Sequence, residues 1–104
     1  MLLSNKDKEK VSNLFKAISD PTRIDILSLL KEEALTVSEI VEKLKMSQSA
    51  ISHQLKTLRD ACLVRANRRG KFVYYSLKDD HVYEIFNQAI EHALEAECEE
   101  KDGK

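Results

Sequence analysis

The sequence predicts a mainly α-helical domain that carries one β-hairpin, and three observations support this fold class. The 104 residues contain only two glycines and one proline, so few positions interrupt a helix. Apolar residues recur at helical spacing over most of the chain. One stretch, residues 63–77, is instead rich in β-branched and aromatic residues around a glycine. The length suits one domain, which we expect to cover residues 1–104.

The first predicted helix covers residues 6–19. Its apolar side chains recur every three or four positions and share one face. They are Val11, Leu14, Phe15 and Ile18. A second helix follows at once, because Asp20 is a good N-cap residue and Pro21 is tolerated in a first helical turn. Five apolar side chains of this helix are expected to be buried: Ile24, Ile26, Leu27, Leu29 and Leu30.

Two shorter helices joined by a tight turn are expected next. Thr36 and Glu39 have the spacing of a capping box, which predicts the start of a third helix. The segment KMS is a tight break, and Ser47 at its end is a cap for a fourth helix over about residues 47–61. Three apolar side chains of the fourth helix should face inward: Ile51, Leu55 and Leu58.

The helical spacing of apolar residues ends after the fourth helix. LVRAN and KFVYYSL are rich in strand-forming residues, and RRG between them predicts a hairpin over about residues 63–77 with Gly70 in its turn. From Asp79 the helical period returns and predicts a long last helix over about residues 79–98. The apolar side chains of this helix are Val82, Ile85, Phe86, Ala89, Ile90 and Ala93.

The formal net charge of −1 conceals an uneven distribution of charge. Residues 43–71 contain eight basic side chains and one acid, Asp60. Residues 79–102 contain nine acids and one base, Lys101. The first segment suits a polyanion and the second would repel one. The alternative is two solvated surfaces of opposite charge.

Two short helices, a tight turn and a basic hairpin in this order predict a winged helix-turn-helix that binds double-stranded DNA. In such a domain the second helix enters the major groove. The predicted recognition helix offers hydrogen-bonding side chains for base edges and cations for phosphates. These are Gln48, Ser49, Ser52, His53, Lys56 and Arg59. The hairpin tip adds cations for the DNA backbone or minor groove, Arg68, Arg69 and Lys71. His53 has an alternative role as a cap or a phosphate contact.

The segments LFKAISDPTRIDILSLL, SQSAISHQLKTL and LVRANRRGKFVYYSL resemble the ArsR/SmtB family of metal-responsive bacterial repressors. The resemblance runs from about Val11 to Glu95. It implies a homodimer, joined through its terminal helices, that represses an efflux or detoxification operon. Such a dimer leaves its operator when an inducer binds. The family name does not identify the inducer, because members sense different metals and some sense none.

Two histidines on the last helix are candidate metal ligands. His81 and His92 are eleven residues apart, close to three turns, so they share a face but lie about 16 Å apart along the axis. One helix therefore cannot bring both to one ion. An antiparallel copy related by a two-fold axis would place His81 of one chain beside His92 of the other, giving two equivalent sites. Asp79 and Glu95 add a carboxylate near each histidine.

Two nitrogen and two oxygen donors suit tetrahedral Zn(II), with Co(II) as the alternative, whereas a thiophilic ion would require sulfur. The last helix also resembles the interfacial site of the family's zinc-sensing branch. That resemblance implies Asp79 and His81 from one chain and His92 and Glu95 from the other as ligands. Some relatives have histidine in place of Glu95, so the preference between cobalt and zinc remains open. The sequence also leaves open whether Glu95 or water is the fourth ligand. The resemblance further implies that the second ring nitrogen of His92 forms a hydrogen bond with the backbone near Cys62. The alternative is that these histidines bind no metal and are ordinary exposed residues beside acids.

The two cysteines support no thiolate metal site. Family members that use one carry cysteines near the start of the third helix, where this chain has ALTVSE with Thr36. Cys62 follows the recognition helix beside apolar residues and is expected to be a small core residue. Cys98 lies near the end of the chain. The alternative function is a repressor of the same family with no metal response, or with a thiol or persulfide inducer sensed by Cys62 and Cys98.

Other classes of protein are not expected. The sequence lacks a glycine-rich phosphate loop and a nucleophile with a base at suitable spacing, and a zinc site with four protein ligands leaves no position for a substrate. We therefore expect no enzyme and no small-molecule substrate. No apolar run reaches the roughly 20 residues that span a bilayer, and the first residues lack the apolar core of a signal peptide. We expect a cytoplasmic protein without membrane contact.

Overall fold

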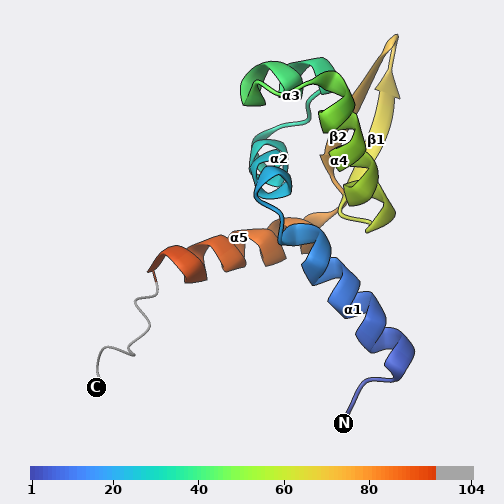
Figure 1. Cartoon of the computed structure of the whole chain (residues 1–104), viewed down its shortest axis with the longest axis vertical. Helices are drawn as coiled ribbons and strands as arrows, with labels where there is room; N and C mark the ends of the chain where they lie inside the picture. Colours follow the sequence, from blue (N-terminus) through green and yellow to red (C-terminus); the bar gives the residue numbers. More distant parts are fainter. Residues whose placement is uncertain (96–104) are drawn as a thin grey trace.

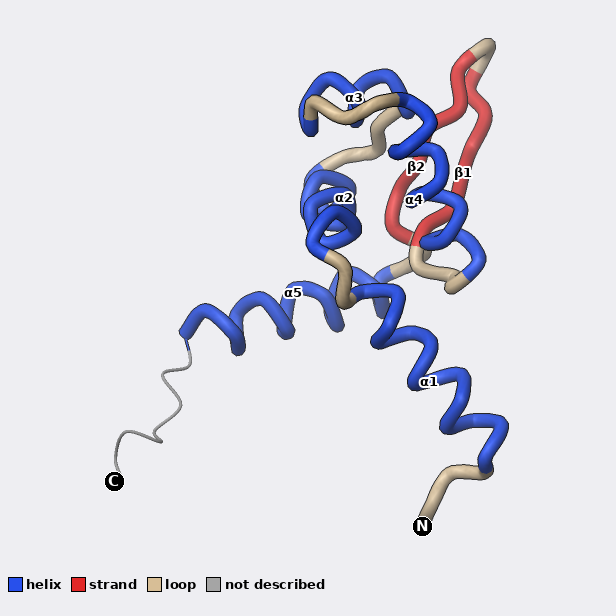
Figure 2. Tube along the Cα trace, viewed as in Figure 1, coloured by secondary structure: helices blue, strands red, loops and turns tan. Residues whose placement is uncertain are grey.

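A computed structural model describes residues 1–95 of the chain. These residues form five helices and one hairpin, which confirms the predicted fold class (Figures 1 and 2). The elements are α1 (Asn5–Ile18), α2 (Pro21–Glu32), α3 (Val37–Leu44), α4 (Gln48–Asp60), β1 (Val64–Arg69), β2 (Phe72–Leu77) and α5 (Asp80–Glu95). Figure 1 shows α2, α3, α4 and the hairpin gathered together, while α1 and α5 extend from them as two arms.

Local side-chain bonds explain where the helices begin. The carboxylate of Asp20 accepts a bond from the backbone N–H of Arg23 at 3.1 Å, and Pro21 occupies the first turn of α2. Thr36 and Glu39 form the complete capping box of α3, with bonds of 3.2 and 2.9 Å. Each cap satisfies an N–H that the first helical turn leaves without an intrahelical acceptor. The predicted starts of α2 and α3 are confirmed.

The hairpin is antiparallel, and its register runs from Val64 opposite Leu77 to Arg69 opposite Phe72. Its turn requires a left-handed residue, which Gly70 provides with φ of 65°. Leu35 pairs with Tyr75 on the other edge of β2, through backbone bonds of 3.0 and 2.7 Å. This bridge fixes the hairpin to the connection between α2 and α3.

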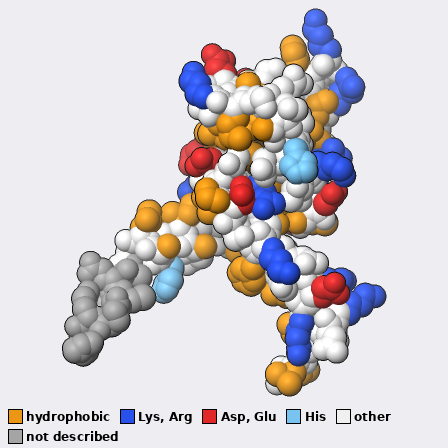
Figure 3. Space-filling view, in the orientation of Figure 1, with side chains coloured by type: hydrophobic (Ala, Val, Ile, Leu, Met, Phe, Trp, Pro, Cys, Tyr) orange, Lys and Arg blue, Asp and Glu red, His pale blue; other side chains and the backbone are white. Residues whose placement is uncertain are grey.

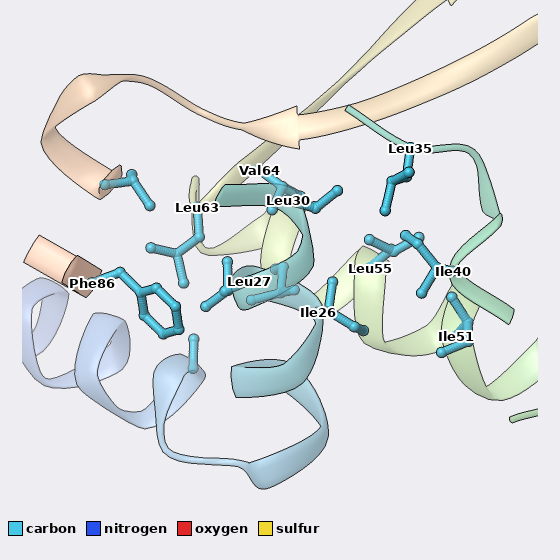
Figure 4. Close-up of a cluster of buried hydrophobic side chains, with 13 residues drawn as sticks. Ile26, Leu27, Leu30, Leu35, Ile40, Ile51, Leu55, Leu63, Val64 and Phe86 are labelled. Atoms are coloured by element: carbon cyan, nitrogen blue, oxygen red, sulfur yellow. The ribbon is translucent and has the colours of Figure 1, made fainter. Parts of the chain in front are cut away.

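The core lies between α2, α4 and the base of the hairpin, as Figure 4 shows. Helix α2 buries Ile26, Leu27 and Leu30, and α4 buries the three residues predicted to face inward, Ile51, Leu55 and Leu58. Figure 4 places Ile51 at one end of the cluster and Phe86 of α5 at the other. Phe86, which is 2% exposed, therefore anchors the beginning of α5 to the core.

The two arms and the start of α2 carry apolar side chains that this chain does not cover. Val11 and Phe15 of α1 are 42% and 61% exposed, and Ile24 and Ile85 are 38% and 45% exposed. The prediction that Ile24 is buried was therefore wrong, and the apolar face of α1 is only partly covered. Apolar spacing shows which face of a helix avoids water, but not which chain covers it. Exposed apolar side chains of this kind are typical of surfaces that contact another protein.

Candidate DNA-binding face and metal-ligand residues

Helices α3 and α4 form a helix-turn-helix whose turn is fixed by local bonds. Lys45 ends α3 in the left-handed conformation, with φ of 59° and its N–H bonded to the carbonyl of Val41. Ser47 then accepts a bond from the N–H of Ala50 at 3.1 Å and caps α4. The hydroxyl of Ser47 also lies 3.4 Å from that of Ser49, so both serines belong to the start of α4.

One side of α4 is buried and the other is open to solvent. The open side holds all six residues of this helix that were predicted to contact DNA, and each is exposed. They are Gln48, Ser49, Ser52, His53, Lys56 and Arg59. Amide, hydroxyl, imidazole and cationic groups on one accessible helix face are what contact with bases and phosphates requires.

The tip of the hairpin is basic, as Figure 3 shows by its Lys and Arg side chains. Arg68, Arg69 and Lys71 are all exposed. Arg69 lies over the ring of Tyr74, with its guanidinium carbon 4.8 Å from the ring centre, and this cation–π contact limits its freedom. Arg68 donates a bond to the carbonyl of Gly70 at 3.3 Å. The contact with Tyr74 was not anticipated from the sequence, although the pairing of Asn67 with Tyr74 places Arg69 two residues away.

The first pair of predicted metal ligands lies at the start of α5. Asp79 precedes the helix, and its Oδ1 accepts a bond from the N–H of Val82 at 3.1 Å. The same oxygen lies 3.7 Å from Nδ1 of His81. The His81 side chain is 88% exposed and that of Asp79 47% exposed, so both are accessible from outside the chain.

The second pair, His92 and Glu95, lies at the other end of α5, and both residues are exposed. Across residues 1–95, no three potential ligands lie close enough together to hold a metal ion. The chain therefore presents two separate pairs of donors at opposite ends of one helix. A single chain cannot combine them, whereas two antiparallel copies of α5 could.

The structure corrects the expectation for Cys62. This residue is exposed and left-handed, with φ of 61°, and is not a small core residue. The N–H of Cys62 bonds to the carbonyl of Arg59, and the N–H of Leu63 bonds to that of Leu58, each at 2.9 Å. These bonds form a Schellman motif that ends α4, in which Leu63 turns inward and Cys62 outward. Cys98 lies outside the described residues.

The expected bond from His92 to backbone near Cys62 does not form within one chain. Figure 1 shows the far end of α5 extending away from the connection between α4 and β1. Such a bond would have to reach the other chain of a dimer. Besides its core contacts, α5 is joined to α2 by a side-chain hydrogen bond from Lys31 Nζ to Asn87 Oδ1, at 2.9 Å. These residues are 56 positions apart, so no local sequence signal could have revealed the contact.

Comparison with known proteins identifies the fold and its family. The family described as "Bacterial regulatory protein, arsR family" matches residues 20–66, which include the whole helix-turn-helix. The chain is also 35% identical over 96 residues to a transcriptional repressor SmtB homolog of Synechocystis, covering 92% of this chain and 73% of that protein. The chain belongs to the ArsR family.

Further relatives and solved structures support membership of this family. A CadC homolog of Staphylococcus aureus, named as a cadmium resistance transcriptional regulatory protein, is 34% identical and covers 89% of this chain and 78% of its own length. A homodimeric winged helix-turn-helix DNA-binding domain from Mycobacterium bovis, described as a possible ArsR-family regulator, has a TM-score of 0.84. It is 26% identical and covers 93% of both chains. Members of this family are DNA-binding transcriptional regulators and not enzymes. In the described part of the chain, no helix is long and apolar enough to cross a membrane.

Proposed function

We propose that this ArsR-family chain is a cytoplasmic transcriptional repressor that binds operator DNA as a homodimer and is released by Zn(II), with Co(II) as the alternative metal. We infer the metal response from four potential metal ligands that lie in two exposed pairs, one at each end of α5. Each pair is incomplete in one chain, and a two-fold axis would combine Asp79 and His81 of one chain with His92 and Glu95 of the other.

The donors fit zinc better than a soft metal. Imidazole nitrogens and carboxylate oxygens are ordinary Zn(II) ligands, and a set of four closes the tetrahedral shell of a structural site. Bound zinc would supply a fixed link between the two chains. The Asp79 carboxylate, which caps α5 and lies 3.7 Å from His81, holds its end of the site in place before metal arrives. A relative named for cadmium resistance supports a metal ion as the class of inducer.

We assign the exposed polar and basic side chains of α4 and of the hairpin tip to DNA. Gln48, Ser49, Ser52 and His53 near the start of α4 would meet base edges or phosphates, and Lys56 and Arg59 would meet phosphates. Arg68, Arg69 and Lys71 at the hairpin tip would contact the backbone or minor groove. The exposed apolar faces of α1 and α5 support a second copy of the chain as the covering surface. A homodimeric ArsR-family relative supports the same arrangement.

The test is the affinity of the purified protein for the DNA upstream of its own gene, measured by fluorescence anisotropy at fixed salt with chelator and then with zinc. Zinc should lower the affinity at least about tenfold, which corresponds to about 1.4 kcal/mol of coupling, and chelator should restore it. His81→Asn should retain DNA binding and lose the zinc response. His53→Asn is the matched control, because it alters the DNA-facing helix and should leave zinc binding unchanged. An equal zinc response in wild type and His81→Asn would refute the assigned ligands.

The second candidate is a repressor with a thiol inducer, which the exposure of Cys62 favours. A zinc-insensitive protein whose DNA affinity falls on oxidation would support this function. Cys62→Ser should then abolish the response to oxidant. DNA binding that responds to neither treatment would indicate a family member without a metal or thiol inducer.

A further inference from the structure

Asp60 is an acidic residue on a helix face that is otherwise polar or basic. Ser52, Lys56 and Asp60 are spaced four positions apart on α4, so they lie in one row along the helix. This row lies on the same exposed side of α4 as the residues that the proposed function assigns to DNA. Residues 43–71 contain eight bases, and Asp60 is the one acid among them.

The carboxylate of Asp60 is engaged with one of those bases. Lys56 Nζ donates a hydrogen bond to Asp60 Oδ2 at 3.3 Å, and the two side chains are 75% and 68% exposed. Together with Ser52, Arg59 and Tyr75, they line a groove of about 440 Å³ between α4 and β2. A polyanion that approaches this groove therefore meets a lysine whose charge a carboxylate already balances.

Helix stability does not account for this pair. Asp60 is the last residue of α4, where the helix dipole disfavours a negative charge. An acid that follows its base by four positions is also the weaker of the two possible orders. Exposed pairs of this kind add little to folding. The main physical effect of Asp60 thus falls on the charge of the groove and not on the stability of the helix.

We propose that Asp60 limits the affinity of the repressor for DNA by competing with phosphate for Lys56 and by repelling the backbone directly. This inference rests on the proposed DNA contact of α4 and is independent of the proposed zinc response. Its consequence for regulation follows from linkage. An inducer lowers the DNA affinity of a repressor by a limited factor. A larger fraction of the repressor therefore leaves the operator when its affinity without inducer is moderate.

The test compares Asp60→Asn with wild type in the presence of chelator, so no metal response enters. Two labelled duplexes serve as probes, the DNA upstream of the gene and a scrambled duplex of equal composition, each titrated over a range of salt. The variant should bind both about three- to tenfold more tightly, because each dimer frees two lysines. The plot of log affinity against log salt should steepen by up to about 1.8, at about 0.9 for each lysine that gains a phosphate.

Two controls assign the effect to this pair. Asp25→Asn removes an equal charge from an exposed position on α2 outside the groove, and should change affinity much less. In a Lys56→Gln background, Asp60→Asn should recover only the smaller part of the gain that comes from direct repulsion. Asp60→Ser serves as a second neutral variant, and thermal melts should show that each folds as wild type does.

An unchanged or weaker affinity of both Asp60 variants, with an unchanged salt slope, would overturn the proposal. So would an equal gain in Asp25→Asn, because the effect would then come from net charge alone. The scrambled duplex tests the inference even if the upstream DNA is not recognised specifically. Failure to distinguish the two duplexes would count against the proposed operator binding, whereas identical salt slopes of variant and wild type would count against Asp60.

Discussion

Replacing Cys62 by glycine should stabilise the protein, because a cysteine here occupies the position of a Schellman motif where glycine is usual. Its φ of 61° lies in the left-handed region, where a side chain with a Cβ costs about 1–2 kcal/mol relative to glycine. The thiol is exposed, so its removal takes little packing from the core. Against this gain stands the greater freedom of glycine in the unfolded chain, worth about 0.4–1 kcal/mol.

The net gain for Cys62→Gly is therefore about 0.5–1 kcal/mol for each chain. In a domain of this size, it should raise the midpoint of thermal unfolding by roughly 2–8 °C. The assay is a thermal melt under reducing conditions at fixed protein concentration, because the stability of a dimer depends on its concentration.

The matched control is Cys62→Ala, which removes the thiol but keeps the Cβ that causes the strain. Its midpoint should stay close to that of wild type. A midpoint for Cys62→Gly at or below that of wild type would refute the conformational argument. An equal rise in both variants would attribute the gain to loss of the thiol instead. The same glycine variant should keep its zinc response, since no proposed ligand is altered.

Substitutions at three further positions test the residues that position α5 and α3. Asp79→Asn should keep the cap on Val82 but weaken zinc binding, whereas Asp79→Ala should also cost about 1 kcal/mol in urea unfolding; equal stability of the two would contradict the cap. Phe86→Ala should cost about 3–5 kcal/mol, because the ring is 2% exposed, and a loss under 1 kcal/mol would show that it does not anchor α5. Thr36→Ala should cost about 1 kcal/mol of unfolding free energy through the lost bond from Glu39, and Thr36→Ser should not.

The sequence predicted those features whose causes are local. The capping box of Thr36 and Glu39 and the turn at Gly70 depend on residues within three positions of one another. The exposure of Cys62 was not predicted, because the left-handed position of a Schellman motif is usually marked by glycine and this sequence has cysteine there. The exposed side of α4 followed from the spacing of its buried residues. The contact between Lys31 and Asn87 spans 56 positions and needs the folded chain to appear.

The arrangement of α5 suggests how a metal at its ends could influence DNA binding. Phe86 and Val82 bury the beginning of α5 in the core that α2 and α4 share. Farther along, Asn87 accepts a bond from Lys31 of α2 and donates one to Glu91, the residue before His92. Between Phe86 and Leu94, α5 also borders an apolar groove of about 440 Å³ that Ile18, Ile24 and Ser28 help to line. A metal link between two such helices would fix the angle between them. A change in that angle would reach α4 through the packed core, which shifts between discrete arrangements more readily than it deforms.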